Sequence, residues 1–264
     1  ALKMTHRPKT LPELQMAAAI GQARLMAKYN EPFSKADCLI GQVLLTQADL
    51  ANRTRHLNIR NTMSCLFRHG IIPIVNENDV VSVDEIKVGD NDVLAAMVAI
   101  LAEADLLVLL STTNGLKESG EVGAARIPFV HSLTDDILGL AKGKGGELST
   151  GGMMTKLQSA HRAVSEGIPT IIADGREDDT LRRIMEGESV GTLLANAQTV
   201  STDGHPHRKQ WIAHFHKYAG FVVIDDGACE AVQNKGKSLL PIGVRSVEGT
   251  FAAGSAIQVK NQQG

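Results

Sequence analysis

Short apolar runs that alternate with segments of helical spacing are the feature that most constrains the fold of this chain. The runs are CLIGQVLLT (38–46), IIPIV (71–75), DLLVLLS (105–111) and IPTIIA (168–173). Continuous apolar runs of this length are typical of strands that are buried on both faces of a parallel sheet. The alternation of strand and helix therefore predicts an α/β domain, with a mostly parallel sheet sandwiched by helices.

Helix signals fill the intervals between these runs. Thr10 and Glu13 form a capping-box pattern with Pro12 in the first turn, which predicts a helix over about 11–29. Further helices are expected over 52–69, 93–104, 133–140, 156–166 and 178–186. Residues 117–125 are charged and contain glycine, so we expect a surface loop there.

The pattern changes near residue 200, where a polar stretch containing Gly and Pro has the composition of a linker. Short β-rich segments follow it, separated by turns: WIAHF (211–215), FVVID (221–225), LLPIGVRSVEG (239–249) and SAIQVK (255–260). This spacing predicts a small β-barrel-like domain. We expect a first domain over 1–199, a linker over 200–207 and the β-rich domain over 208–264.

Composition narrows the classes of protein. The chain has 264 residues and a formal net charge of -2, so the whole molecule carries no electrostatic footprint for nucleic acid. No apolar run approaches a membrane span and no signal peptide is recognisable, which favours a cytoplasmic location. The three cysteines, Cys38, Cys65 and Cys229, are far apart and odd in number, so reduced thiols are expected.

The densest cluster of acidic and amide side chains lies in NENDVVSVDEIKVGDND (76–92). Its first four residues leave the end of a predicted strand, and its last four enter a predicted helix. In an open α/β sheet, ligands bind in the crevice at the carboxyl ends of the strands. Asp and Asn are also common in turns and at helix N-caps, which is the structural alternative. Two such clusters bracketing one loop favour a ligand site.

A glycine-rich segment, KGKGGELSTGGMMTK (142–156), precedes another predicted helix. Backbone N–H groups exposed by glycines at a helix N-terminus bind phosphate oxygens. The segment is not a Walker A motif, because Gly152 stands where the lysine should be, and it does not fit GxGxxG. A flexible loop is the simpler interpretation of 142–147. STGGMMTK (149–156) differs, since it offers backbone donors, hydroxyls and one cation to a polyphosphate.

Four histidines cluster near the linker, at His205, His207, His214 and His216. His214 and His216 would share one face of a strand and are a possible metal pair. No third ligand lies at a suitable spacing, so solvated histidines are favoured and no metal site is predicted.

Four motifs resemble the glutamate 5-kinase family: residues 76–92 and 149–156, AAAIGQARLM (17–26) and SLLPIGVRSVEGTFAAGSAI (238–257). Members of that family have the amino acid kinase fold and often a C-terminal PUA domain, and the resemblance covers nearly the whole chain. It implies ATP-dependent phosphorylation of the γ-carboxylate of L-glutamate, the first step of proline biosynthesis, with Mg²⁺ as cofactor. It also implies proline as a feedback inhibitor and a homo-oligomer.

The resemblance also implies roles for individual residues. Asp79 and Asn91 fall on substrate-binding positions, with Asn76 close by. Asp92 falls on the aspartate that organises the catalytic lysines, and Lys156 on the lysine that neutralises charge on the transferring phosphoryl group. The implied nucleotide-binding residues are Ser111, Thr112, Thr150, Gly151, Gly152, Met153, Met154, Thr155 and Lys156.

The sequence departs from the family pattern in several places. The family begins with a strand that bears a catalytic lysine and a glycine-rich turn, and we expect that N-terminal βαβ portion to be missing here. Thr112 stands where the family usually has aspartate, and Lys117 replaces a tyrosine. The PUA-like region is also expected to be incomplete.

Two alternatives to this function stay open at the level of sequence. One is a degenerate kinase scaffold whose PUA-like domain binds structured RNA through Lys235, Lys237 and Arg245. The near-neutral charge makes RNA an unlikely partner. The other is a kinase for another amino acid or for carbamate.

Overall fold

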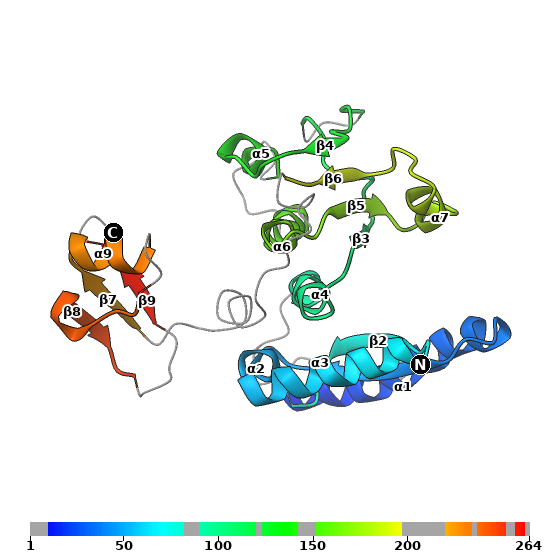
Figure 1. Cartoon of the computed structure of the whole chain (residues 1–264). Helices are drawn as coiled ribbons and strands as arrows, with labels where there is room; N and C mark the ends of the chain where they lie inside the picture. The colour runs from blue at the N-terminus through cyan, green and yellow to red at the C-terminus, as the bar shows by residue number, and fades with distance from the viewer. Residues whose placement is uncertain are drawn as a thin grey trace. The chain divides into compact units, whose positions relative to one another are not determined.

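The structure is a computed structural model that describes residues 10–81, 90–119, 123–141, 152–196, 220–233, 237–251 and 257–261 (Figure 1). The chain divides into two compact units, Ala1–Gln210 and Trp211–Gly264. The predicted domain limits and the linker over 200–207 stay predictions. Among the described residues, no helix combines the length and the apolar character needed to cross a membrane.

The first unit opens with a long helix, α1 (Leu11–Lys35). It begins where the capping-box pattern predicts, and the Thr10 N–H donates a hydrogen bond to Glu13 Oε2 at 3.3 Å. The helix continues past the predicted end near Tyr29 and contains Pro32. After the helix, the chain changes direction at Asp37, which has a φ of 55°. No side chain of α1 is fully buried, so the helix covers a sheet with one face only.

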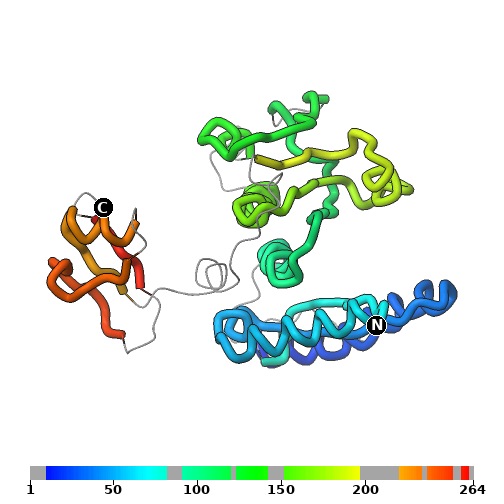
Figure 2. Tube along the Cα trace, in the orientation of Figure 1, coloured from blue at the N-terminus to red at the C-terminus, as the bar shows by residue number. Residues whose placement is uncertain are grey.

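A two-stranded parallel sheet lies beside α1, formed by β1 (Ile40–Leu45) and β2 (Ile72–Glu77) (Figure 2). Ile40 pairs with Ile72 and Leu45 with Glu77, so both strands end at one edge. Two helices connect them, α2 (Gln47–Ala51) and α3 (Arg53–Arg68), where the sequence predicts one. Asn52 separates the two helices. Its side chain accepts a hydrogen bond from the Arg55 N–H at 3.1 Å and caps α3.

A four-stranded sheet forms the rest of the unit, in the order β3 (Leu107–Ser111), β5 (Thr170–Asp174), β6 (Thr192–Leu194) and β4 (Phe129–Val130). β3 is parallel to β5 and β4 to β6, whereas β5 and β6 are antiparallel. Three of the four pairs among the described strands of this unit are thus parallel, counting β1 with β2. The mostly parallel α/β architecture is confirmed, although the described strands form two sheets rather than one.

Two helices, α4 (Asp90–Leu101) and α6 (Met153–Ser165), pack side by side against β3 (Figure 1). Small residues make their close approach possible, because Ala96 and Ala99 of α4 and Ser159, Ala160 and Ala163 of α6 are all buried. Both helices begin three residues earlier than predicted. The residues expected to enter these helices therefore lie within their first turns.

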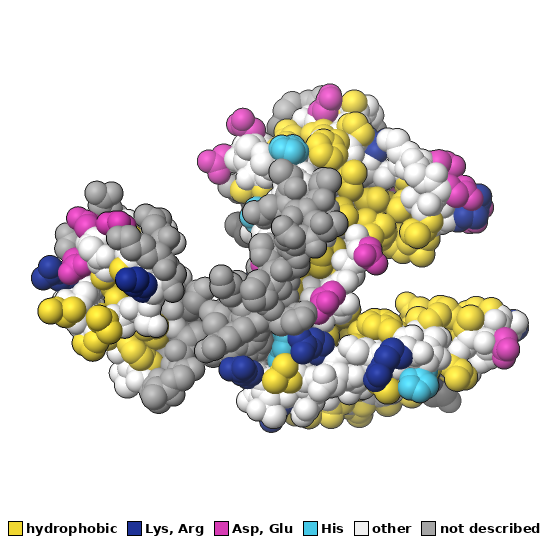
Figure 3. All heavy atoms as spheres, viewed as in Figure 1, with side chains coloured by type: hydrophobic (Ala, Val, Ile, Leu, Met, Phe, Trp, Pro, Cys, Tyr) yellow, Lys and Arg dark blue, Asp and Glu magenta, His cyan; other side chains and the backbone are white. Residues whose placement is uncertain are grey.

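Shorter helices complete the first unit: α5 (Asp135–Ala141) and α7 (Thr180–Met185). Acidic and basic side chains gather around α7 (Figure 3), where Arg182 pairs with Asp179 and Glu186. The Arg182 side chain is 57% exposed, so these pairs are solvated and stabilise the fold little.

The described part of the second unit contains a three-stranded sheet with β7 (Gly220–Ile224) at its centre. β8 (Val244–Gly249) is antiparallel to it and β9 (Gln258–Lys260) is parallel. The helix α9 (Asp226–Gln233) follows β7. Asp225 Oδ1 caps this helix by accepting a hydrogen bond from the Ala228 N–H at 2.8 Å. The short 3-10 turn η2 (Pro241–Gly243) precedes β8. The WIAHF segment and the four histidines near the linker lie outside the described residues.

The side chain of Thr192 in β6 joins this strand to the segment between β3 and β4. Thr192 Oγ1 accepts from the Leu116 N–H at 2.8 Å and donates to the Ile127 carbonyl at 2.6 Å. The preceding Gly191 has φ of 66°, and a Cβ there would overlap the carbonyl oxygen of Ile172. Only glycine therefore fits at residue 191.

The variant Gly191→Ala should lower the free energy of unfolding by at least about 3 kcal/mol, since the left-handed backbone and the overlap with Ile172 act together. Gly187→Ala is the matched control, because its φ of 81° is also left-handed while the space around it is open. It should cost only about 1 kcal/mol. Urea unfolding of both variants measures the difference, and equal losses would contradict the overlap.

Candidate functional site

The centre of the candidate site is an ion pair between the first turns of α4 and α6. Lys156 Nζ donates to Asp92 Oδ2 at 2.7 Å, and the two side chains are only 15% and 16% exposed. The residues are 64 positions apart in sequence. The structure brings them together because the small side chains between α4 and α6 place the two helix N-termini next to each other.

The position of Lys156 is electrostatically unusual. A helix N-terminus carries a partial positive charge, so a cation in the first turn of α6 is unfavourable unless an anion lies nearby. Asp92 supplies that anion from α4. Removing either partner would leave a mostly buried charge without its counter-ion, which costs about 3–5 kcal/mol when burial is complete.

Among the described residues, no side chain caps the first turn of α6. Its N-cap is Gly152, which has no side chain to accept from the first N–H groups. Met153, Met154 and Thr155 follow, and Thr155 Oγ1 donates to the Gly152 carbonyl at 3.3 Å. A helix start with free N–H groups and a lysine in its first turn can bind phosphate. The predicted residues Thr150 and Gly151 lie outside the described residues.

The carboxyl ends of β3 and β5 form a second part of the site. Ser111 pairs with Asp174 in the parallel ladder, and Thr112 follows β3. Arg176 Nη2 donates both to Asp174 Oδ2 and to the Thr112 carbonyl, each at 2.6 Å. The hydrogen bonds from Arg176 hold the pKa of Asp174 at about 2.

Arg176 thus fixes the loop that contains Thr112 to the end of β5, and its side chain remains 67% exposed. Sequence reasoning missed Arg176 and Asp174 as site residues. The only local signal was an aspartate at the end of an apolar run, followed by Gly and Arg.

The third part lies at the carboxyl end of β2, which α4 contacts. Asn76 Nδ2 donates to Gln22 Oε1 of α1 at 2.8 Å. The Asn78 N–H donates to the Leu45 carbonyl at 2.8 Å, which holds the start of the following loop against the end of β1. Asp79 is half-buried in that loop, and burial raises the pKa of its carboxyl group.

The remaining predicted residues fall in different places. Asn91 lies in the first turn of α4, beside Asp92, and its side chain is exposed. Residues 82–89 of the acidic loop lie outside the described residues. Among the residues that the structure describes, no group of three or more His, Cys, Asp or Glu side chains could hold a metal ion.

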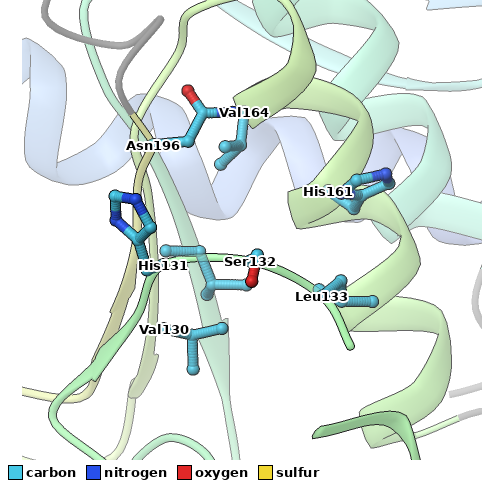
Figure 4. Close-up of a pocket in the computed structure, with 8 residues that line it drawn as sticks. Val130, His131, Ser132, Leu133, His161, Val164 and Asn196 are labelled. Carbon is cyan, nitrogen blue, oxygen red and sulfur yellow. The ribbon is translucent and has the colours of Figure 1, made fainter. Parts of the chain in front are cut away.

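A cavity of about 420 Å³ lies elsewhere in the first unit, lined by Val130, Leu133, Leu194 and Val164 together with His131, Ser132, His161 and Asn196 (Figure 4). It opens at the carboxyl ends of β4 and β6. Because β5 and β6 are antiparallel, this is the opposite edge of the sheet from Ser111 and Asp174. Val164 lies about 12 Å along α6 from Lys156. The cavity is therefore distinct from the candidate site.

Comparison with protein families defines the class of this protein. Residues 2–174 match the amino acid kinase family and residues 220–264 match the PUA domain. The chain is thus an amino acid kinase with a C-terminal PUA domain, and membership of this kinase class implies ATP as the phosphoryl donor.

Individual relatives define the family more narrowly. The glutamate 5-kinase of Syntrophotalea carbinolica is 44% identical over 266 residues, which cover 100% of this chain and 70% of the relative. The glutamate 5-kinases of Moorella thermoacetica and Paraburkholderia phymatum are each 45% identical over 267 residues and are covered to 69% and 70% of their lengths. The chain belongs to the glutamate 5-kinase family.

The raised pKa of Asp79 predicts a pH-dependent effect on stability. Because the pKa in the folded protein lies above the ordinary value of 3.8, the neutral carboxyl group is favoured by folding. The contribution of the neutral Asp79 carboxyl group to the free energy of unfolding is fully present below pH 3.8 and is lost as the pH rises through the raised pKa. Asp79→Asn removes the ionisation, so its melting temperature at pH 7 should equal or exceed that of the unchanged chain.

Thermal unfolding between pH 4 and pH 7 is the measurement, and the advantage of Asp79→Asn should grow with pH. An Asp79→Asn protein that is less stable than the unchanged chain at pH 7, with the gap closing at low pH, would show that the ionised form is the favoured one.

Proposed function

We propose that this chain transfers the γ-phosphoryl group of ATP to the γ-carboxylate of L-glutamate, the first step of proline biosynthesis. The observation that carries the proposal is the Lys156–Asp92 pair at the N-terminus of α6. No described side chain caps this N-terminus. Relatives named glutamate 5-kinase that match the whole chain supply the substrate.

The chemistry requires alignment and charge neutralisation rather than a general base. A carboxylate oxygen is already a nucleophile, and it attacks the γ-phosphorus while the bond to the leaving oxygen of ADP breaks. Negative charge then spreads over the transferring group. Lys156 and the first N–H groups of α6 are fixed in advance around that charge, so no rearrangement is needed during the reaction.

Asp92 acts in this scheme by positioning Lys156. The carboxylate holds the ammonium group at 2.7 Å, in one orientation and out of bulk water. A lysine without that partner would lose its fixed geometry, because its side chain has four rotatable bonds. Asp92 also compensates the charge of Lys156 when no phosphate is present.

The substrate side comprises Asn76, Asp79 and Asn91. Asp79, when ionised, can accept from the α-ammonium group of glutamate, and the two amides can orient its polar groups. The burial that raises the pKa of Asp79 also makes its charge attract an ammonium group more strongly than an exposed carboxylate would. The same Asp79→Asn change that maintains stability is thus expected to weaken glutamate binding.

The nucleotide side comprises Ser111 and Thr112 at the end of β3 and residues 150–156 before and within α6. Mg²⁺ in such enzymes is usually held by substrate phosphates with few protein ligands. The described residues offer no cluster of three ligands, so we assign Mg²⁺ to the phosphates of ATP and no step of the scheme to a protein-bound metal.

Two further expectations follow from the family and remain predictions: inhibition by proline and a homo-oligomer. A cytoplasmic location, which the sequence favours, also remains a prediction. In the part of the second unit that the structure describes, no observation favours RNA binding. Arg245 forms an ion pair with Asp225 at 3.2 Å, and Lys235 lies outside the described residues.

The reaction can be tested by incubating the chain with ATP, Mg²⁺, L-glutamate and hydroxylamine, which traps γ-glutamyl phosphate as a hydroxamate. Lys156→Ala should lower the rate by about 10²–10³-fold, the cost of removing one preorganised donor to developing charge. Lys28→Ala is the matched control, since Lys28 is an exposed lysine on α1, and it should leave the rate unchanged.

Aspartate and carbamate, assayed separately as phosphoryl acceptors with ADP release as the readout, distinguish the alternative substrates and should give little product. The proposal fails if the unchanged chain forms no more hydroxamate than Lys156→Ala, or if ADP release with aspartate or carbamate exceeds that with glutamate.

A further inference from the structure

The side chain of Gln22 on α1 combines one satisfied atom with one unsatisfied atom. Its Oε1 accepts from Asn76 Nδ2 at 2.8 Å, across 54 positions of sequence. Its Nε2 is buried and has no acceptor among the residues that the structure describes. One half of the carboxamide therefore fixes Asn76, and the other half presents N–H donors that no described protein group uses.

Such an arrangement is unfavourable unless a ligand completes it. Buried amide N–H groups are almost always hydrogen-bonded in native proteins, and exceptions cluster where a ligand or strain has a role. Gln22 cannot satisfy Nε2 by rotating its amide alone, because Nε2 would then face the Asn76 Nδ2 donor. In the structure, Nε2 is therefore the atom of Gln22 for which no described residue supplies an acceptor.

The location of Gln22 indicates the chemistry of the missing acceptor. Asn76 is the fifth of the six residues of β2, and the loop that carries Asp79 begins directly after that strand. Asp79 offers oxygen acceptors that suit an ammonium group, whereas Gln22 Nε2 offers a donor that suits a carboxylate oxygen. An amino acid with a second carboxylate has both kinds of group.

We propose that Gln22 is a specificity-determining residue of the substrate site, an inference that rests on the proposed function. Gln22 Oε1 fixes the amide of Asn76, and Gln22 Nε2 donates a hydrogen bond to a carboxylate oxygen of bound glutamate. A site built to donate to a particular substrate group rejects analogues that lack it, because its donor is then left unpaired.

The variant Gln22→Glu separates the two roles. It has nearly the same shape and keeps an oxygen that can accept from Asn76, but it replaces the Nε2 donor with an oxygen that repels a carboxylate. We expect the KM for glutamate to rise by about tenfold or more. The KM for ATP should stay the same and kcat should change less than about twofold, because phosphate contacts on α6 are untouched.

Two further variants complete the design. Gln47→Glu is the matched control. Gln47 is an exposed glutamine at the start of α2, and its replacement by glutamate adds the same charge. It should leave both KM values unchanged. Gln22→Met keeps the volume but removes both hydrogen bonds, so it should also raise the KM for glutamate, and circular dichroism shows whether each variant is folded.

Calorimetric titration of glutamate into the unchanged chain and into Gln22→Glu gives a readout that does not need turnover. The inference is overturned if the unchanged chain binds glutamate and Gln22→Glu binds it equally well, or if the two KM values rise together. Failure of the unchanged chain to bind or phosphorylate glutamate would instead remove the proposed function, and this inference with it.

Discussion

The ion pair between Lys156 and Asp92 is the interaction on which the candidate site depends. It places a cation in the first turn of α6, where the helix alone would disfavour one, and it does so in surroundings that exclude most of the solvent. The pair forms only because α4 and α6 approach closely through small side chains. Packing in the middle of the two helices therefore determines the geometry at their ends.

Three features of the candidate site reduce the stability of the fold. Lys156 opposes the helix dipole, burial raises the pKa of Asp79, and Gln22 Nε2 is buried without an acceptor among the described residues. Each of these groups matches a part of the proposed substrates: phosphate, ammonium and carboxylate. Local conflicts of this kind are expected at functional sites, because a protein evolved for folding alone would remove them.

Much of the architecture could be predicted from sequence, since the long strands are apolar runs and α1 begins with a clear capping box. The short strands β4 and β6 could not, because two or three residues hold no periodic pattern. Thr192 of β6 is instead joined by side-chain hydrogen bonds to Leu116 and Ile127, which lie between β3 and β4 in the sequence. The starts of α4 and α6 were placed too late, because the glycine and polar residues around both starts are typical of loops.

The dense local motifs 76–92 and 149–156 predicted Asp92 and Lys156 as candidate site residues, and the structure brings these two together. Gln22 and Arg176 could not be assigned, because each acquires its meaning from a partner far away in sequence, Asn76 and Thr112 respectively. A single glutamine on a long helix carries no local signal. The structure adds what composition and spacing lack, namely the contact between Gln22 and Asn76.

A double-mutant cycle on Asp92 and Lys156 tests the central claim most directly, with kcat measured for Asp92→Asn, Lys156→Met and the double variant. If Asp92 acts by positioning Lys156, the double variant should be no slower than Lys156→Met, because the positioning group has nothing left to position. Multiplication of the two single effects in the double variant would contradict this account, since it would show that the two residues act independently.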